Sequence, residues 1–375
     1  MTRTSLRIPK VLLVADLGSS ASKFFYRVRE SATTPLWMGA EVAPHLSQAS
    51  LPRFGAGGRP QDDAWLQIGQ EVVLVGDVAR AYLEGNSLTV NKAELAAYKL
   101  AAAVGVVAEL ENSSKTFEAV VWLALPLTEL GTRDEIRTHF QSLCQQGFSF
   151  RGQPLQIQGS LQVFPEGFGL YLNRKQQLKS MGQVINQRRT LIVMMGHRNL
   201  SVLRFEAGSL KAAGSSSNGP GFWPIFEKSA RALGVTTPDY GALMNAILTG
   251  QGKQISAARG RLFDFSEQLA ACRDSYWQAM KIYWQDHVMP QLESSQVDVI
   301  ISGGASQVLR SQLEGYFAEL GLAERVYFAD GAYERLDTVV KTLPEAAQNG
   351  AMALRMADGY GLFRGLIGTL NQVAA

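Results

Sequence analysis

A carboxylate and an ammonium group flank a turn of small residues near the start of the chain. Asp16 ends a continuous apolar run that is typical of a buried strand, and Lys23 begins a second run in which apolar and polar residues alternate. The turn contains Gly18, Ser19 and Ser20, whose small size lets backbone N–H groups approach an anion. Lys23 can meet the same anion, and Asp16 can hold Mg²⁺ through water. The segment predicts either a phosphate-binding hairpin or a plain hairpin with a solvated Asp–Lys pair.

Adjacent glycines follow another apolar run in the last third of the chain. Residues 297–302 predict a buried strand, and Gly303, Gly304 and Ala305 separate it from a segment with helical spacing. Glycines at such a junction let a ligand approach the backbone, and the N-terminus of a helix favours negative charge. Tight packing of the strand against the helix explains the same residues equally well, so both interpretations stay open.

A third glycine turn consists of Gly196, His197, Arg198 and Asn199. It joins two apolar runs, and it would face the first turn if the two halves of the chain are related by duplication. An ordinary hairpin with Gly or Asn at positive φ is the simpler interpretation, in which His197 is a turn residue and not a ligand. The spacing of histidines, cysteines and carboxylates predicts no zinc site, and the sequence contains neither a Gly-x-Ser-x-Gly elbow nor a Walker lysine loop.

Glu166 follows a proline at the end of a further apolar segment. The simpler interpretation is an exposed turn residue. Its position in the sequence between the two hairpin turns makes it a candidate for the base that orients an attacking water.

The elements that must position these residues show a weak internal repeat. Residues 10–28 and 189–208 each read as an apolar strand, a glycine turn and a returning strand, which a duplicated architecture would produce. Residues 161–172 predict short strands, and the polar stretch 175–188 predicts a connector between domains. Helices are expected over 92–110 and through most of the second half of the chain.

Composition narrows the class of protein. A chain of 375 residues with 46% hydrophobic residues is long enough for two domains, each with its own core. Its net charge of +3 gives no strong attraction to nucleic acid or anionic lipid. Cys144 and Cys272 are too few for a disulfide scaffold. No apolar run is long enough to span a membrane, and the N-terminal apolar stretch is too short for a signal peptide, so we expect a cytoplasmic protein.

In their order along the chain, these segments resemble the motifs of the actin-like ATPases, specifically the plasmid-segregation branch typified by ParM. VADLGSSASK resembles the first phosphate motif, FPEGFGLYL the first connecting segment, MMGHRNLSVLRF the second phosphate motif and IISGGASQVL the adenosine motif. LVGDVARAY and LALPLTEL resemble two further family segments, and PEAAQNGAMAL the second connecting helix.

The resemblance implies a two-domain α/β fold of the duplicated, ribonuclease-H-like type, with ATP or GTP and Mg²⁺ in the cleft between domains. Domain I would comprise residues 1–185, with the helix 350–375 packing back on it, and domain II residues 186–349. Asp16 would lie on the Mg²⁺ side, and Glu166 would position the attacking water. The turns would supply the remaining contacts, from Gly18, Ser19, Ser20 and Lys23, from Gly196, His197, Arg198 and Asn199, and from Gly303, Gly304 and Ala305.

One departure from the family pattern concerns hydrolysis. Met194 stands where the second phosphate motif usually has an Asp, and a thioether cannot orient a metal-bound water. His197 and Arg198 would instead offer cationic or donor groups to the γ-phosphate. Nucleotide binding therefore carries over from the family more readily than hydrolysis does.

The implied function is a bacterial actin-like protein that binds ATP and assembles head to tail into filaments for plasmid segregation or intracellular positioning. A DNA-bound adaptor protein would be its partner, so the filament itself would not touch nucleic acid. Two alternatives stay open: a nucleotide-binding scaffold with little hydrolysis, which Met194 favours, and a non-polymerising kinase of the same superfamily.

Overall fold

The computed structural model describes residues 10–47, 58–80, 82–83, 95–184, 188–256, 259–292, 296–344 and 351–374. The chain forms two compact units, of which unit 1 is Met1–Glu166 with Leu362–Ala375 and unit 2 is Gly167–Gly361. The assignment of residues 1–185 and 186–349 to two family domains stays a prediction, because a division by compactness is not a division by family domain.

Unit 1 is built on a mixed sheet whose strands run in the order β3-β2-β1-β7-β9-β8-β5-β6-β4. The strand β1 pairs antiparallel with β2 and parallel with β7, and β9 continues the parallel part. Its strands are β1 (Lys10–Leu17), β2 (Ser22–Val28), β3 (Thr34–Met38), β4 (Val42–Ser47), β5 (Ala64–Ile68), β6 (Glu71–Val75), β7 (Thr116–Leu125), β8 (Phe148–Phe150) and β9 (Gln153–Pro165). Nearly all of β1 is buried, as expected of a parallel strand inside a sheet.

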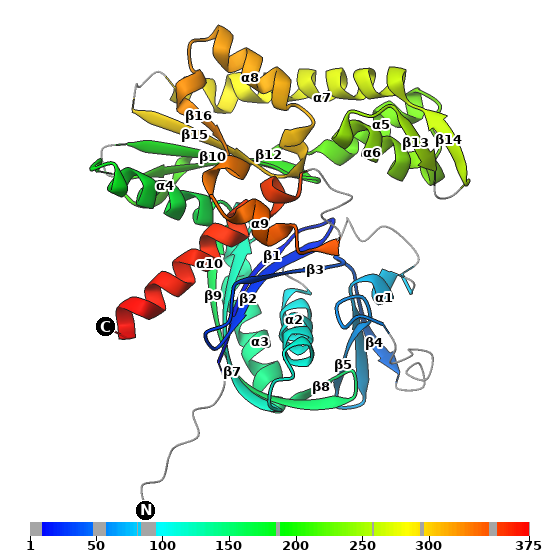
Figure 1. Cartoon of the computed structure of the whole chain (residues 1–375), viewed down its shortest axis with the longest axis vertical. Helices are drawn as coiled ribbons and strands as arrows, with labels where there is room; N and C mark the ends of the chain where they lie inside the picture. Colours follow the sequence, from blue (N-terminus) through cyan, green and yellow to red (C-terminus); the bar gives the residue numbers. More distant parts are fainter. Residues whose placement is uncertain are drawn as a thin grey trace, which may run out of the picture. The chain divides into compact units, whose positions relative to one another are not determined.

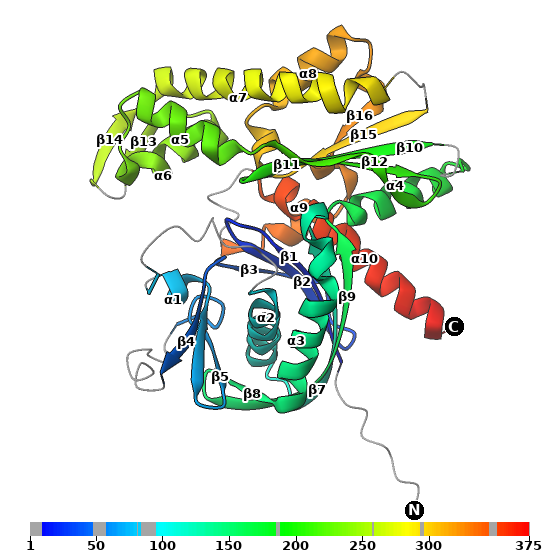
Figure 2. The same cartoon turned by 180° about the vertical axis from the view of Figure 1, so that it is seen from behind.

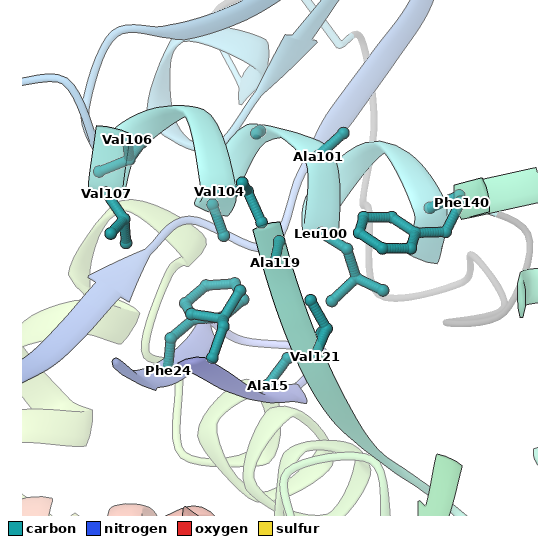
Figure 3. Packing of buried hydrophobic residues seen from close by; sticks show 14 of the residues in the cluster. Ala15, Phe24, Leu100, Ala101, Val104, Val106, Val107, Ala119, Val121 and Phe140 are labelled. Atoms are coloured by element: carbon teal, nitrogen blue, oxygen red, sulfur yellow. The ribbon is translucent and has the colours of Figure 1, made fainter. Parts of the chain in front are cut away.

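The core of unit 1 lies between this sheet and two helices. Its helices are α1 (Asp77–Arg80), α2 (Ala96–Leu110) and α3 (Arg133–Gln146), followed at the end of the chain by the last part of α10 (Met352–Ala374). Figure 3 shows Leu100 and Val104 of α2 facing Ala15, Phe24 and Val121 of the sheet. The helix is rich in alanine and valine because it is buried on nearly every side.

The sheet of unit 2 repeats the topology of five neighbouring strands in the sheet of unit 1. It runs β12-β11-β10-β15-β16, matching β3-β2-β1-β7-β9 in order and direction. The strands are β10 (Arg189–Met195), β11 (Asn199–Glu206), β12 (Ser209–Pro220), β15 (Val297–Ser302) and β16 (Val326–Phe328). The weak repeat expected from residues 10–28 and 189–208 is therefore confirmed as a duplicated unit.

Helices cover both faces of the unit 2 sheet. Figures 1 and 2 both show α7 on one face and α4 on the other. The helices are α4 (Phe168–Ser180), α5 (Phe222–Ala232), α6 (Tyr240–Thr249), α7 (Ser266–His287), α8 (Arg310–Glu319), α9 (Leu336–Val340) and the first part of α10, and a hairpin of β13 (Lys253–Ser256) and β14 (Arg261–Asp264) adjoins α6. Leu191, Val193 and Met195 of β10 face the α7 side, whereas Tyr171 of α4 stacks on Phe205 of β11.

Two sequence-based expectations are wrong at the junction after Glu166. Of the strands expected over 161–172, residues 161–165 belong to β9, but 168–172 begin the helix α4, which also takes in 175–180 of the expected connector. Residues 185–187 lie outside the described part. Gly167, with φ of +87°, lies between the end of β9 at Pro165 and the start of the helix at Phe168. The buried carboxylate of Asp358 accepts hydrogen bonds from the N–H groups of Gly167 (2.7 Å) and Leu170 (3.2 Å). The cap of α4 thus comes from a residue far along the chain, which local pattern cannot reveal.

A second difference concerns the glycines after β15. The helix expected there does not start at Gly304, because Gly304–Gln307 form a single 3₁₀ turn and α8 begins only at Arg310. The glycines are therefore followed by a 3₁₀ turn and not directly by the N-terminus of α8. Of the expected second connecting helix, residues 345–350 lie outside the described part, and α10 begins at Met352.

Candidate functional site

The first hairpin turn of unit 1 has room only for small residues. The ladder between β1 and β2 ends at the pair Leu17–Ser22, so Gly18 to Ala21 form the turn. A Cβ on Gly18 would lie 2.6 Å from the carbonyl oxygen of Ala21, closer than any side chain permits. Ser20 is exposed at the tip, and Ser19 is partly exposed. The predicted glycine turn is therefore in place.

Asp16 and Lys23 face each other across β1 and β2 and form an ion pair. The carboxylate is almost fully buried, and the lysine is largely so. A buried carboxylate needs a partner of opposite charge, because transfer from water to the protein interior is costly. The plain-hairpin interpretation assumed a solvated pair, and the structure contradicts that part of it. The pair instead forms a fixed polar group beside the turn.

Glu166 lies at the same edge of the unit 1 sheet as Asp16. The register aligns Asp16 with Ala124 of β7, and Ala124 with Phe164 of β9. Glu166 therefore comes directly after the last residue of β9. Because β7 lies between them, the backbones of β1 and β9 are two strand spacings apart, which is about 10 Å. The backbone N–H of Glu166 donates a hydrogen bond to the carbonyl of Leu125 (2.7 Å). This bond holds the backbone of Glu166 against the end of β7. Half-buried Glu166 and buried Asp16 thus share the carboxyl edge of this sheet.

The second hairpin turn, in unit 2, has the same construction. The ladder between β10 and β11 reaches the pair Met195–Leu200, and a Cβ on Gly196 would lie 2.7 Å from the carbonyl oxygen of Asn199. The start of α5 braces this turn, since the N–H of Trp223 donates to the carbonyl of His197 (2.9 Å).

His197 is uncharged at neutral pH. Its ring packs on that of Trp223, with the ring centroids 4.9 Å apart. Burial lowers the pKa of His197 to about 4, and the positive charge of Arg355 contributes to the shift. His197 therefore offers a hydrogen-bond donor or acceptor and not the cation that the sequence left open. Arg198, next in the turn, is exposed.

Met194 occupies the position in unit 2 that Asp16 occupies in unit 1. It pairs with Ser201 on β11 and Ser302 on β15, as Asp16 pairs with Lys23 and Ala124. The ion pair of unit 1 is thus replaced by a thioether and a hydroxyl. The strand register thus places Met194 at the position that corresponds to Asp16.

The glycines of the third turn lie against β10 and the start of α10. Gly303 has φ of +92°, and a Cβ there would lie 2.3 Å from the carbonyl oxygen of Met195. The hydroxyl of Ser302 (3.0 Å) and the N–H of Gly303 (3.3 Å) both donate to the carbonyl of Leu354. These bonds hold the first turn of α10 to the end of β15. Ala305, the last residue of the third turn, is buried.

Arg355 borders the third turn, and no motif in the sequence points to it. It is half-buried, and its side chain lies across Gly304, whose hypothetical Cβ would be 3.0 Å from Cγ and 3.1 Å from Cδ of the arginine. The residue belongs to no motif, and a polar position in a helix carries no signal that it meets a glycine turn. Only the close approach of α10 to β15 reveals it.

Asp16, the residue that the family resemblance places on the Mg²⁺ side, offers a metal one carboxylate. Among the described residues no group of three or more His, Cys, Asp or Glu side chains could hold a metal ion. One carboxylate fits Mg²⁺, which retains several waters and takes further oxygens from phosphates.

The described helices include none that is long and apolar enough to cross a membrane.

Comparison with solved structures identifies the fold. The chain is similar to the actin-like protein Alp7A, with a TM-score of 0.68 and 14% identity over 97% of this chain and 99% of that one. It is also similar to the archaeal actin homologue Ta0583 (TM-score 0.62, 17% identity, 96% and 99% covered), which has also been solved in complex with ADP. A ParM from a 15-stranded filament of Clostridium botulinum gives a TM-score of 0.59 at 15% identity, with 92% and 98% covered.

The chain therefore has the actin-like fold of ParM, Alp7A and archaeal actin homologues. The α/β class and the resemblance inferred from the sequence are confirmed at the level of the fold. No family model and no curated protein sequence matches the chain.

Proposed function

We propose that the protein is a cytoplasmic, bacterial actin-like protein that binds ATP or GTP with Mg²⁺ and assembles head to tail into filaments. Its role would be plasmid segregation or intracellular positioning. The observation that carries the proposal is the hairpin turn that both units repeat in the same register, closed by Gly18 in one and Gly196 in the other. The similar structures support it, because one is described as an ADP complex and another as a filament.

In this proposal each turn has a role set by its chemistry. The backbone and hydroxyl groups of Ser19 and Ser20 bind phosphate oxygens, as do those of Gly196 to Asn199, because N–H groups of a tight turn favour anions. Gly303, Gly304 and Ala305 meet the nucleoside. Asp16 holds the waters of Mg²⁺, which when bound neutralises charge that develops on the phosphates. Lys23 fixes the Asp16 carboxylate and adds positive charge beside the phosphates.

Glu166 is the proposed base that orients the attacking water. It shares the carboxyl edge of the sheet with Asp16, and its backbone is held by Leu125. The replacement of the second carboxylate by Met194 favours slow hydrolysis, so a scaffold that binds nucleotide and rarely hydrolyses it is the second candidate.

Light scattering and phosphate release, measured together on the purified full chain with ATP and Mg²⁺, test the proposal. Scattering with phosphate release supports a dynamic filament, and scattering without release supports the scaffold. Turnover without scattering, and only after a small molecule is added, would support a kinase. Binding of neither ATP nor GTP would refute all three.

Glu166→Gln should leave nucleotide affinity within about twofold and slow phosphate release by about 100-fold, because a positioned base contributes roughly 10²–10⁴-fold to such a step. Gln keeps the shape of the side chain and removes its basicity. Single-turnover phosphate release measures the rate, and calorimetric titration the affinity. An unchanged release rate would remove Glu166 from the mechanism.

We further propose that contact with DNA is indirect, through a DNA-bound adaptor protein. The modest net charge of +3 is consistent with this, since direct binding to DNA needs a strong basic patch. Pelleting of filaments with naked DNA at physiological salt would contradict an indirect contact.

A further inference from the structure

The hairpin of β13 and β14 in unit 2 carries an apolar pair that faces water. Ile255 and Leu262 lie directly opposite each other in the ladder, so their side chains share one face of the hairpin. Ile255 is 69% exposed and Leu262 63%, and no large apolar side chain among the described residues is more exposed than Ile255. Because an antiparallel hairpin normally turns polar residues to water, an outward apolar pair is typical of a contact surface.

Buried polar contacts fix the orientation of this hairpin. Its other face is turned to α6, since the hydroxyl of Ser256 donates to the buried carboxylate of Asp239 (2.7 Å) just before that helix. The side-chain amide of Asn245 on α6 donates to Gln254 (2.7 Å). A rotation that buried the apolar pair would break both hydrogen bonds, so the pair is held outward.

Positive charge borders the apolar pair. Residues 253–264 contain one acidic residue, Asp264, and three basic ones, Lys253, Arg259 and Arg261. The Asp264 carboxylate caps α7, where it accepts hydrogen bonds from the N–H (3.0 Å) and the hydroxyl (2.5 Å) of Ser266. Lys253 and Arg261 are both exposed. This hairpin surface, with an apolar centre and a basic border, fits an apolar surface with an acidic border.

The other end of unit 2 carries such a surface. Figures 1 and 2 both show β13 and β14 at one end of the unit and β16, which follows α8, at the other. There Leu320, the residue after α8, is 44% exposed, and Tyr327 of β16 is 38% exposed. The hydroxyl of Tyr327 donates to the carbonyl of Glu324 (2.9 Å). Arg174 lies over the ring (4.6 Å) and is itself paired with the buried carboxylate of Asp298 (3.0 Å).

Negative charge borders these two side chains. Residues 314–327 contain one basic residue, Arg325, and three acidic ones, Glu314, Glu319 and Glu324. The Arg325 guanidinium donates to the carbonyls of Leu292 (3.0 Å) and Val297 (3.1 Å). Glu319 and Glu324 are exposed, and neither forms an ion pair with a described residue. This α8 surface therefore matches the hairpin surface in apolar character and opposes it in charge.

We propose that the hairpin surface of one copy of the chain docks on the α8 surface of the next. The inference rests on the proposed function, because it names the surfaces through which the filament is built. The two surfaces differ and lie at opposite ends of one unit, so the contact is heterologous and can repeat into an open row. Its apolar side chains form the centre of a larger contact, since a stable interface buries about 800 Å² on each partner.

Two variants that each disable one surface test the contact. Leu262→Asp places a carboxylate in the apolar pair, and Glu319→Lys/Glu324→Lys reverses the charge of the α8 surface. Each should raise the protein concentration needed for sedimentation with ATP or GTP and Mg²⁺ by roughly 100-fold, because like charges then meet in the contact. Ile282→Asp, at a position of α7 that is 64% exposed and outside both surfaces, is the matched control and should assemble as the wild type does.

Mixing the two variants shows whether the surfaces contact each other. Each variant keeps one intact surface, so the mixture should form a dimer of one copy of each, whereas each variant alone stays monomeric in analytical ultracentrifugation. The combined variant Leu262→Asp/Glu319→Lys/Glu324→Lys should recover part of the assembly, because the new carboxylate meets lysines. A folding defect would produce neither result.

Sedimentation of either variant at the wild-type concentration would overturn the inference, as would a mixture without dimers. Circular dichroism and calorimetric titration with ATP, below the concentration at which the wild type sediments, should give wild-type results for both variants. If Leu262→Asp does not fold, Ile255→Thr/Leu262→Thr takes its place, since threonine keeps a β-branched side chain on each strand. A wild-type chain that sediments with neither nucleotide would instead refute the assembly in the proposed function.

Discussion

Gly303→Ala should destabilise unit 2 by at least about 3 kcal/mol and abolish measurable nucleotide binding. The residue has φ of +92°, which strains any L-amino acid with a side chain, and the new Cβ would lie 2.3 Å from the carbonyl oxygen of Met195. Relief requires β15 and β10 to separate at the edge that carries both turns of unit 2. Urea unfolding followed by tryptophan fluorescence measures the stability, since several tryptophans lie in this unit.

Gly315→Ala is the matched control for that experiment. Gly315 is exposed on α8, and a Cβ there meets nothing within 4 Å. The change should be neutral or stabilise the protein by about 0.5–1 kcal/mol, because alanine is the better helix former. Unfolding of Gly303→Ala at the same urea concentration as Gly315→Ala would contradict the close approach of Gly303 to Met195.

Asp16→Ala should remove the dependence of ATP affinity on Mg²⁺ and lower stability by about 3–5 kcal/mol. The stability loss arises because Lys23, itself largely buried, loses the carboxylate that it faces across the strands. The loss of Mg²⁺ dependence is expected because Asp16 is the carboxylate proposed to hold the waters of the ion. Titration with ATP in the presence of Mg²⁺ and of EDTA measures the second effect.

The double variant Asp16→Ala/Lys23→Met separates the two effects of that change. It removes both members of the ion pair and gives unit 1 an uncharged pair, as Met194 and Ser201 form in unit 2. Stability should recover, because no buried charge loses its partner, while the Mg²⁺ dependence should stay absent. A double variant that still needs Mg²⁺ for tight ATP binding would show that Asp16 does not hold the ion.

The elements that carry the turns could be predicted from the sequence because their signals are local. A continuous apolar run specifies a buried strand such as β1 or β15, and small residues between two such runs specify a turn. The repeat of residues 10–28 at 189–208 was visible for the same reason. Gly18, Gly196 and Gly303 were identified correctly as turn glycines, although the close carbonyl contacts that require them became visible only in the structure.

The helix α4 shows where this local reasoning fails. Its first residues alternate in a way that suggested strands, and its start depends on the carboxylate of Asp358, which is distant in sequence. Likewise, the glycines after β15 predicted a helix start, but Gly304–Gln307 form a 3₁₀ turn and α8 begins only at Arg310.

Sequence alone thus determined the strand-turn-strand segments, the missing second carboxylate and the candidates Asp16 and Glu166, since each depends on neighbouring residue types. Tertiary structure alone decided that Asp16 is buried against Lys23, that His197 is neutral and that Arg355 crosses Gly304. The physical reason is that charge state and close approach depend on groups brought together by strand register and helix packing. Those groups are far apart along the chain, and no local pattern records which of them will meet.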